Sequence, residues 1–220
     1  RLGLRKPTGE SYGPVIPGRA ARACPLVFRR QLSGIDEHAA PNRYLSVVNT
    51  CEVKDGDKWA RFEPCDGFRL EFTIDFPHPV FGLENRHVVV DFAEHSYAKE
   101  VARARTFGFM QDVEAMRAAG LGLGGSLQNA VVLNEFGVLN SEGLRYDNEF
   151  VRHKVLDAIG DLYLLGHPLI GQYTAYKSGH ALNNQLARAL LARPDAFEVV
   201  TFTDAATVPT AFHDWSLSAA

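Results

Sequence analysis

Long apolar runs are absent from this chain of 220 residues. A membrane-spanning helix needs roughly 18 or more consecutive apolar residues, and no stretch approaches that length, so we expect no transmembrane segment. The first residues also lack the apolar core of a secretory signal peptide. These two absences predict a cytoplasmic protein. The chain does not begin with Met, which leads us to expect a fragment of a longer protein.

The chain also has no excess of basic residues and few cysteines. The chain has 23 Lys and Arg against 26 Asp and Glu, a formal net charge of -3. Nucleic-acid binders usually carry a basic excess, so we expect no nucleic-acid partner. The three cysteines, Cys24, Cys51 and Cys65, are odd in number and lack the spacing of metal ligands. We interpret them as reduced thiols rather than a disulfide, in keeping with a cytoplasmic location.

Hydrophobic residues make up 46% of the chain, an ordinary globular composition. Alternating apolar and polar residues between positions 44 and 92 predict strands joined by tight turns, in an antiparallel meander with one face to cover. Helical spacing prevails later, and strands return near the end. The order predicts an α+β fold in which a two-layer antiparallel sheet is packed on helices. Helices are expected at 96–104, 111–119, 147–165 and 181–191, and later strands at 130–133, 171–177 and 198–202.

Two irregular stretches interrupt these elements. Residues 105–109 form a polar-aromatic elbow, and residues 120–126 are rich in glycine. The glycine run lacks the Lys-Ser/Thr of a phosphate loop, and we expect no parallel βαβ unit around it. We therefore interpret the run as close backbone packing beside a groove.

The helix around residues 149–161 carries the first chemical signal. His153 and Asp157 are one turn apart on the same face, and Asp161 extends the stripe by another turn. A neutral imidazole and a carboxylate at this spacing suit a divalent metal such as zinc, but the same pattern is typical of a plain surface pair. Apolar positions on the same helix are expected to seat it on the core: Val151, Val155, Ala158, Ile159 and Leu162.

Further candidates lie on neighbouring segments. His180 follows Gly179 at a corner between a strand and a helix, where an imidazole could act as a general acid or simply cap or pack. Asp161 could hold the far N–H of that imidazole or remain solvated. Lys154 could stabilise a developing oxyanion or face water, and Thr106 could donate a hydrogen bond or cap a helix. These residues alone indicate no more than a metallohydrolase.

Four stretches taken together resemble the second domain of the UDP-3-O-acyl-N-acetylglucosamine deacetylases, the zinc amidases of lipid A synthesis. The likeness runs from about Cys24 to Phe212 and depends on long motifs. They are DGDKWA (55–60), ARTFGFM (104–110), FVRHKVLDAIGDL (150–162) and AYKSGHALNN (175–184).

The resemblance implies a role for each matching residue. His153 and Asp157 would be two of three protein ligands of Zn2+. His180 would protonate the leaving amine, oriented by Asp161, while Lys154 and Thr106 would lie in the active site, with Thr106 helping the zinc hold the tetrahedral oxyanion. The substrate would be UDP-3-O-acyl-N-acetylglucosamine, from which acetate is released. Its acyl chain would pass residues of the elbow and the glycine-rich insert: Phe107, Gly124, Ser126 and Ala130.

The chain also departs from the family pattern. The Thr-Val-Glu-His-type motif of the first domain, which would supply the general base and the third zinc ligand, is absent. We therefore expect residues 1–23 to be an irregular arm unlike the family, 24–40 a remnant of the first domain, 41–212 the second domain and 213–220 a tail. Residues 24–36 show the pattern of a short amphipathic helix.

Two functional hypotheses follow from this departure. The chain is an impaired zinc-dependent deacetylase, or it is a non-catalytic truncated remnant that binds the nucleotide sugar or a complementing first-domain fragment. In either case we expect little or no turnover by the chain alone, because loss of a general base typically costs roughly 10²–10⁴-fold.

Overall fold

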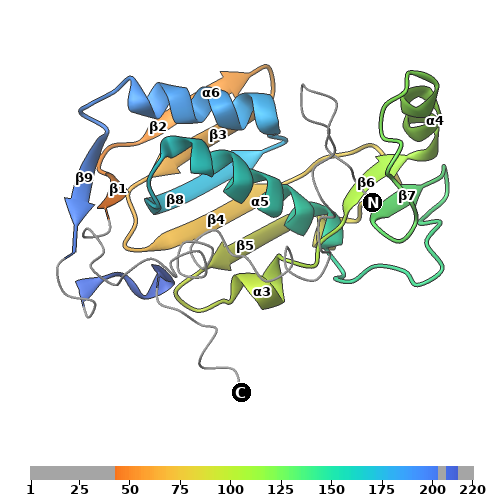
Figure 1. Cartoon of the computed structure of the whole chain (residues 1–220), viewed down its shortest axis with the longest axis horizontal. Helices are drawn as coiled ribbons and strands as arrows, with labels where there is room; N and C mark the ends of the chain where they lie inside the picture. The colour runs from red at the N-terminus through yellow and green to blue at the C-terminus, as the bar shows by residue number, and fades with distance from the viewer. Residues whose placement is uncertain (1–42, 203–206, 213–220) are drawn as a thin grey trace, which may run out of the picture.

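The structure is a computed structural model that describes residues 43–202 and 207–212. The expected arm at 1–23, the helix at 24–36, the whole first-domain remnant at 24–40 and the tail at 213–220 lie outside these residues. Figure 1 shows a sheet with two long helices packed across it and a smaller lobe at one end. The predicted α+β class, with a mostly antiparallel sheet packed against helices, is confirmed.

The strand β8 (Leu169–Tyr176) is the centre of the main sheet. It pairs antiparallel with β3 (Lys58–Glu63) on one side and parallel with β4 (Phe68–Thr73) on the other. The strand β2 (Cys51–Asp55) extends the sheet beyond β3, and β5 (His87–Asp91) extends it beyond β4. The predicted continuous meander is therefore wrong, because a strand from late in the chain lies between β3 and β4.

Two further strands continue the sheet at the start of β8. The strand β1 (Arg43–Val47) runs parallel to β8, with Leu45 opposite Leu169. The strand β9 (Phe197–Thr201) then pairs antiparallel with β1. Both segments were expected to be strands. The pairing of β1 with β8, and of β9 with β1, was not predicted.

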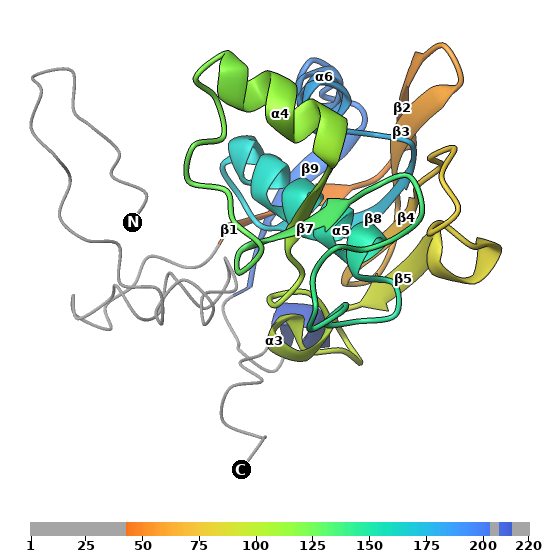
Figure 2. The same cartoon turned by 90° about the vertical axis from the view of Figure 1, so that its right-hand side faces the viewer.

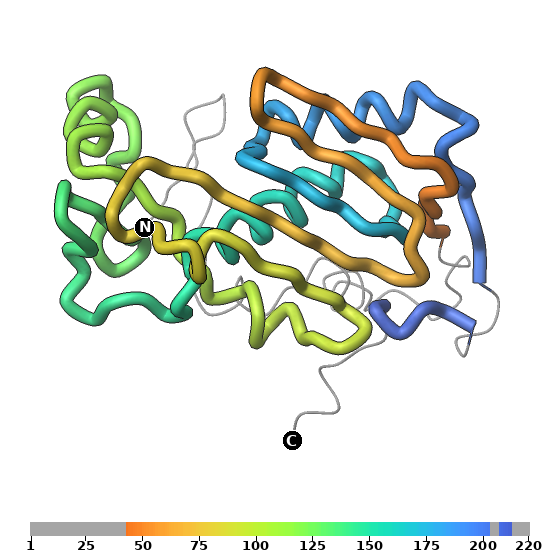
Figure 3. Tube along the Cα trace, turned by 180° about the vertical axis from the view of Figure 1, so that it is seen from behind, coloured from red at the N-terminus to blue at the C-terminus, as the bar shows by residue number. Residues whose placement is uncertain are grey.

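Two helices cover one face of the sheet, α5 (Glu149–Leu162) and α6 (His180–Leu191). The view from behind in Figure 3 has the sheet in front and both helices beyond it. The apolar stripe predicted on α5 is confirmed, because every one of its members is buried against the sheet. These members are Val151, Val155, Ala158, Ile159 and Leu162.

The smaller lobe contains β6 (Thr106–Phe109), α4 (Met110–Ala118) and β7 (Ala130–Leu133), seen end-on in Figure 2. The two strands pair in parallel. Two predictions are corrected here: residues 106–109 form a strand rather than an elbow, and a parallel βαβ unit does surround the glycine-rich run. That run follows α4, whereas a phosphate loop precedes its helix, so it is still not a P-loop.

The remaining described helices are short. The helix expected at 96–104 is one turn long, α3 (Tyr97–Glu100). The described residues also include the single-turn 3-10 helices η1 (Leu83–Asn85), η2 (Tyr163–Leu165) and η4 (Thr210–Phe212).

Candidate active site

The carboxylate of Asp157 lies at the centre of the candidate site. Its Oδ1 is 3.3 Å from Nε2 of His153, and its Oδ2 accepts a hydrogen bond of 2.9 Å from Nζ of Lys154. Nε2 of His180 lies 3.9 Å from the same Oδ2. Asp157 and His153 each expose 15% of their side chain, so the pair is partly shielded yet reachable. The structure thus brings three of the predicted residues, His153, Lys154 and His180, around the carboxylate of a fourth, Asp157.

His180 is the first residue of α6 and faces Asp161 on α5. Its Nδ1 lies 2.9 and 3.0 Å from the two oxygens of Asp161, so the imidazole donates its Nδ1–H to that carboxylate. Nε2 is left pointing toward Asp157, and the side chain of His180 is 68% exposed. This arrangement holds an imidazole in one orientation with its second nitrogen free to exchange a proton.

Asn183 supports this pair, and sequence reasoning gave it no role. Its Nδ2 donates to Oδ2 of Asp161 at 2.8 Å, and its Oδ1 accepts 2.6 Å hydrogen bonds from the hydroxyls of Tyr173 and Ser178. Asn183, Tyr173 and Ser178 are all buried. The position of Asn183 one turn after His180 is a signal for a shared helix face. No sequence signal connects Tyr173, because it comes from the middle of β8.

The surroundings of His153 favour its neutral form, which is the form that can bind a metal. Burial lowers its pKa, against the opposing effect of the Asp157 carboxylate. Its Nδ1 lies 3.4 Å from the carbonyl oxygen of Ala104, which can only accept, so that nitrogen is the donor. Nε2 then carries the free lone pair, and it is the nitrogen that faces Asp157. Metal-binding histidines are usually oriented in this way by a carbonyl or carboxylate on their other nitrogen.

The strand β6 carries two more predicted residues, of which Phe107 lies against His153. Phe107 is half-buried, and its ring meets the ring of His153 at a centroid distance of 6.4 Å, edge to face. Thr106 precedes it, is exposed and stands in register with Ala130 of β7. Phe107, Thr106 and Ala130 therefore share one short sheet next to the imidazole.

Gly124 and Ser126 lie on the exposed loop that leads into β7. Asn129 closes this loop by donating to the carbonyl of Gly124 at 2.9 Å and accepting from the N–H of Ser126 at 2.8 Å. Leu121 and Leu123 on the same loop are 60% and 73% exposed. The loop therefore offers apolar surface on the smaller lobe.

The donor set fits part of a zinc coordination sphere. An imidazole nitrogen and a carboxylate oxygen are ligands that zinc accepts, and the neutral state of His153 suits binding. Over residues 43–202 and 207–212, however, no group of three His, Cys, Asp or Glu is placed to hold a metal ion. His153 and Asp157 are the two candidate donors that the geometry of the described residues brings together.

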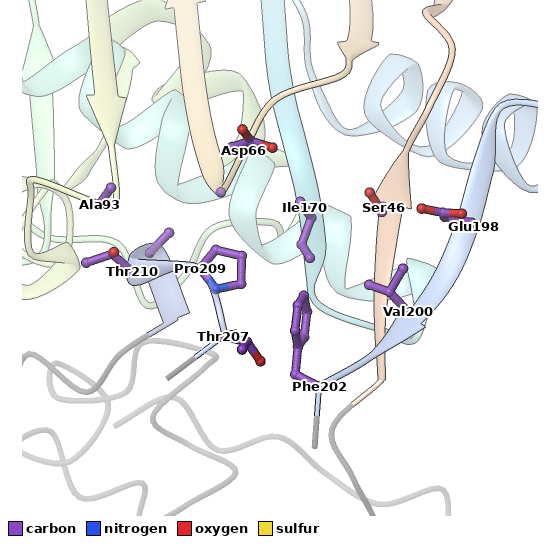
Figure 4. Close-up of a pocket in the computed structure, with 12 residues that line it drawn as sticks. Ser46, Asp66, Ala93, Ile170, Glu198, Val200, Phe202, Thr207, Pro209 and Thr210 are labelled. Atoms are coloured by element: carbon purple, nitrogen blue, oxygen red, sulfur yellow. The ribbon is translucent and has the colours of Figure 1, made fainter. Parts of the chain in front are cut away.

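Two surface cavities lie elsewhere. One of 490 Å³ lies at the sheet end shown in Figure 4, among Ser46, Asp66, Ile170 and Glu198. Another of 440 Å³ lies beside Arg145 at the start of α5. No predicted site residue lines either cavity, so neither supports the candidate chemistry.

Comparison with known proteins shows which family the chain resembles. The sequence model of the UDP-3-O-acyl N-acetylglycosamine deacetylases, LpxC, matches residues 10–192. The chain belongs to this family. The matched range begins at residue 10, inside the segment 1–23, so the LpxC likeness starts earlier than the four motifs indicated.

Similar LpxC proteins are found in Shewanella. UDP-3-O-acyl-N-acetylglucosamine deacetylases of Shewanella sp. strain W3-18-1 and of Shewanella baltica strain OS155 are each 54% identical over 211 residues. Each match covers 96% of this chain and 69% of the relative. In the part of the chain that the structure describes, no helix has the length and apolar character needed to cross a membrane.

Proposed function

We propose that the chain acts in the reaction for which its relatives are named, the release of acetate from UDP-3-O-acyl-N-acetylglucosamine. The observation that carries this proposal is the pairing of two imidazoles around Asp157, one oriented by a carboxylate and one by a backbone carbonyl. In such an arrangement one imidazole can bind a metal while the other acts as a general acid. The proposed setting is the cytoplasm.

In this proposal His153 and Asp157 would hold Zn2+ as two of its protein ligands. Bound zinc would polarise the amide carbonyl and favour attack by water. His180 protonates the leaving amine through Nε2, while Asp161 holds Nδ1 and stabilises the charged imidazole. Lys154 and the hydroxyl of Thr106 favour the negative charge that develops on the carbonyl oxygen. Phe107, Gly124, Ser126 and Ala130 border the path of the acyl chain.

The test is turnover of UDP-3-O-acyl-N-acetylglucosamine by the purified chain, together with its zinc content. We expect a low rate that chelator abolishes and that His180→Gln lowers by about 10²–10⁴-fold, as expected for loss of a general acid. His87→Gln is the matched control, because His87 is also exposed beside a carboxylate, 3.9 Å from Glu71. Equal loss in both variants, or turnover that chelator leaves unchanged, would contradict the proposal.

One observation favours a second candidate, a non-catalytic chain that binds the nucleotide sugar or a complementing first-domain fragment. The described residues supply two metal donors rather than three. Zinc and turnover should therefore be measured with and without the N-terminal third of a Shewanella relative. Stoichiometric zinc and activity only in the mixture would support a split enzyme, whereas neither in either sample would support the non-catalytic chain.

A further inference from the structure

A buried ion pair links the strand that carries Thr106 to the helix that carries His153. The side chains of Arg105 and Glu149 are 2% and 0% exposed. The guanidinium donates to both carboxylate oxygens, from Nε at 2.9 Å and from Nη2 at 3.0 Å. It also donates to Glu142 at 2.8 Å and to the carbonyl of Gly143 at 2.7 Å. None of these atoms takes part in the proposed chemistry.

The carboxylate of Glu149 also binds the backbone. Its Oε1 accepts the N–H of Arg105 at 2.8 Å, and its Oε2 accepts the N–H of Arg145 at 2.6 Å. Burial opposes ionisation of Glu149, but these four hydrogen bonds outweigh it and hold the pKa of the carboxyl below its ordinary value. Glu149 is therefore a charged, fully bonded clamp on two segments of chain.

One peptide group connects this clamp to the metal ligand. The N–H of Arg105 and the carbonyl of Ala104 belong to the same planar unit, so fixing one end fixes the other. Glu149 holds the N–H end, and Nδ1 of His153 donates to the carbonyl end at 3.4 Å. Glu149 and His153 lie one turn apart on the same face of α5, and the peptide spans the gap between them.

We propose that Glu149, together with Arg105, is a positioning residue that sets the imidazole orientation of His153 by clamping the Ala104–Arg105 peptide. The same clamp places Thr106, the next residue, at the start of β6. This inference rests on the proposed function for the identity of His153 as a zinc ligand. It concerns the protein's own groups, so it can be measured in the metal-free chain.

The test uses Arg105→Met combined with Glu149→Leu in the full chain. Replacing a buried ion pair by apolar side chains of similar volume is often neutral for stability, so this double variant removes the clamp without leaving a lone buried charge. The matched control is Arg152→Met with Glu100→Leu. That pair likewise anchors α5 through an Arg–Glu contact, to α3 at 2.6 Å, but has no bond to residues 104–106.

Three measurements report on the clamp. In the metal-free chain, amide hydrogen exchange at position 105 should become about tenfold faster or more, because a charge-assisted hydrogen bond is lost. The NMR cross-peaks between the rings of His153 and Phe107 should weaken. Zinc affinity, from competition with a chelator, should fall about 10–100-fold, as for other partners of metal ligands. The control pair should leave all three unchanged.

The outcomes separate this inference from the proposed function. A folded double variant with wild-type exchange and cross-peaks would overturn the positioning role, as would equal losses in the control. A wild-type chain that takes up no zinc would overturn zinc binding, while exchange and cross-peaks still decide the positioning role. If the double variant does not fold, Glu149→Gln decides, because its amide oxygen can still accept one bond. The proposal then requires a partial loss of protection at position 105, and unchanged protection contradicts it.

Discussion

Each imidazole near Asp157 is held through its Nδ1 by an oxygen acceptor on its far side. Asp161 holds His180, Asn183 in turn holds Asp161, and the carbonyl of Ala104 holds His153. The orientation of a titratable ring therefore depends on buried polar groups that must all be satisfied. Such networks are costly to break in part, because the groups left behind lose their partners in a medium of low dielectric.

The Asn183 amide offers a direct test of this dependence. Asn183→Ala leaves the buried hydroxyls of Tyr173 and Ser178 without their acceptor, so the free energy of unfolding should fall by about 2–3 kcal/mol. Urea denaturation measures the change. Asn184→Ala is the control, because Asn184 accepts an exposed hydrogen bond from Arg188, and it should change stability by less than about 0.5 kcal/mol. Equal losses of stability at the two positions would mean that the hydrogen bonds of Asn183 to Tyr173, Ser178 and Asp161 do not stabilise the fold.

Glu149 makes the second prediction at this scale. Its pKa is lower in the folded chain, so the unfolded chain takes up a proton first as the pH falls. The stabilisation is complete above the unfolded value of about 4.3 and is lost as the pH falls through the folded value. Glu149→Gln should be about 3–5 kcal/mol less stable at neutral pH, with the gap closing in acid. Urea denaturation between pH 7 and acid, with the exposed Glu114→Gln as control, measures this. A gap that stays constant with pH would count against it.

Spacing along one helix was sufficient to predict part of the site. His153, Asp157 and Asp161 repeat at the period of α5, so their shared face followed from the sequence. Local sequence context suggested His180, Lys154 and Thr106 as candidates, and the family resemblance gave them roles and added Phe107. The structure brings His180 and Lys154 next to the Asp157 carboxylate. Glu149 and Tyr173 bond to residues of other elements, Arg105 and Asn183, and a single sequence carries no periodic signal for such contacts.

At the scale of elements, β8 decides the topology. Alternation of apolar and polar residues predicted most of the main-sheet strands to within about two residues, because that pattern depends only on which face is buried. It carries no information on the neighbour or its direction. The sequence order of β3 and β4 therefore favoured a hairpin, whereas β8 separates them and pairs with both. The strand β6 was missed because it is short and none of its residues is fully buried.

Gly171 shows why β8 can pass so close to its neighbours. Its φ is +154°, and a Cβ there would lie 2.8 Å from Cγ2 of Val47 and 3.2 Å from the carbonyl oxygen of Glu63. Gly171→Ala should therefore destabilise the chain by about 1–3 kcal/mol through overpacking. Gly160→Ala is the control, because nothing lies within 4 Å of a Cβ at that helical position.

The control should move stability in the opposite direction. Alanine in place of an exposed helical glycine is expected to stabilise by about 0.5–1 kcal/mol, since it restricts the unfolded chain. Thermal unfolding of both variants measures the difference. A neutral Gly171→Ala would show that β1 and β3 can move away from β8 at no cost.

Across the whole molecule, the two lobes differ in how much apolar surface they bury. The main sheet with α5 and α6 contains most of the hydrophobic core, whereas no residue of α4 is buried. Local opening requires less energy where few apolar contacts must break. The acyl path is proposed to lie along this less stable lobe, and the paired carboxylates and imidazoles lie on the more stable one. A rigid centre beside an adaptable surface is consistent with one reaction on a long apolar substrate.

Hydrogen exchange measured over the whole chain tests this division. Amides of β8 and α5 should exchange by near-global unfolding. Those of α4 and residues 119–129 should exchange at least about a hundredfold faster, which corresponds to an opening free energy lower by roughly 3 kcal/mol. Adding a UDP-3-O-acyl sugar should slow exchange in residues 119–130 while leaving β2 and β3 unchanged. UDP alone is the control, because it lacks the acyl chain and should leave the lobe unprotected. If α4 proved as protected as α5 in the free chain, the lobe would be part of the rigid core. If UDP alone protected residues 119–130, their protection would not report on the acyl chain.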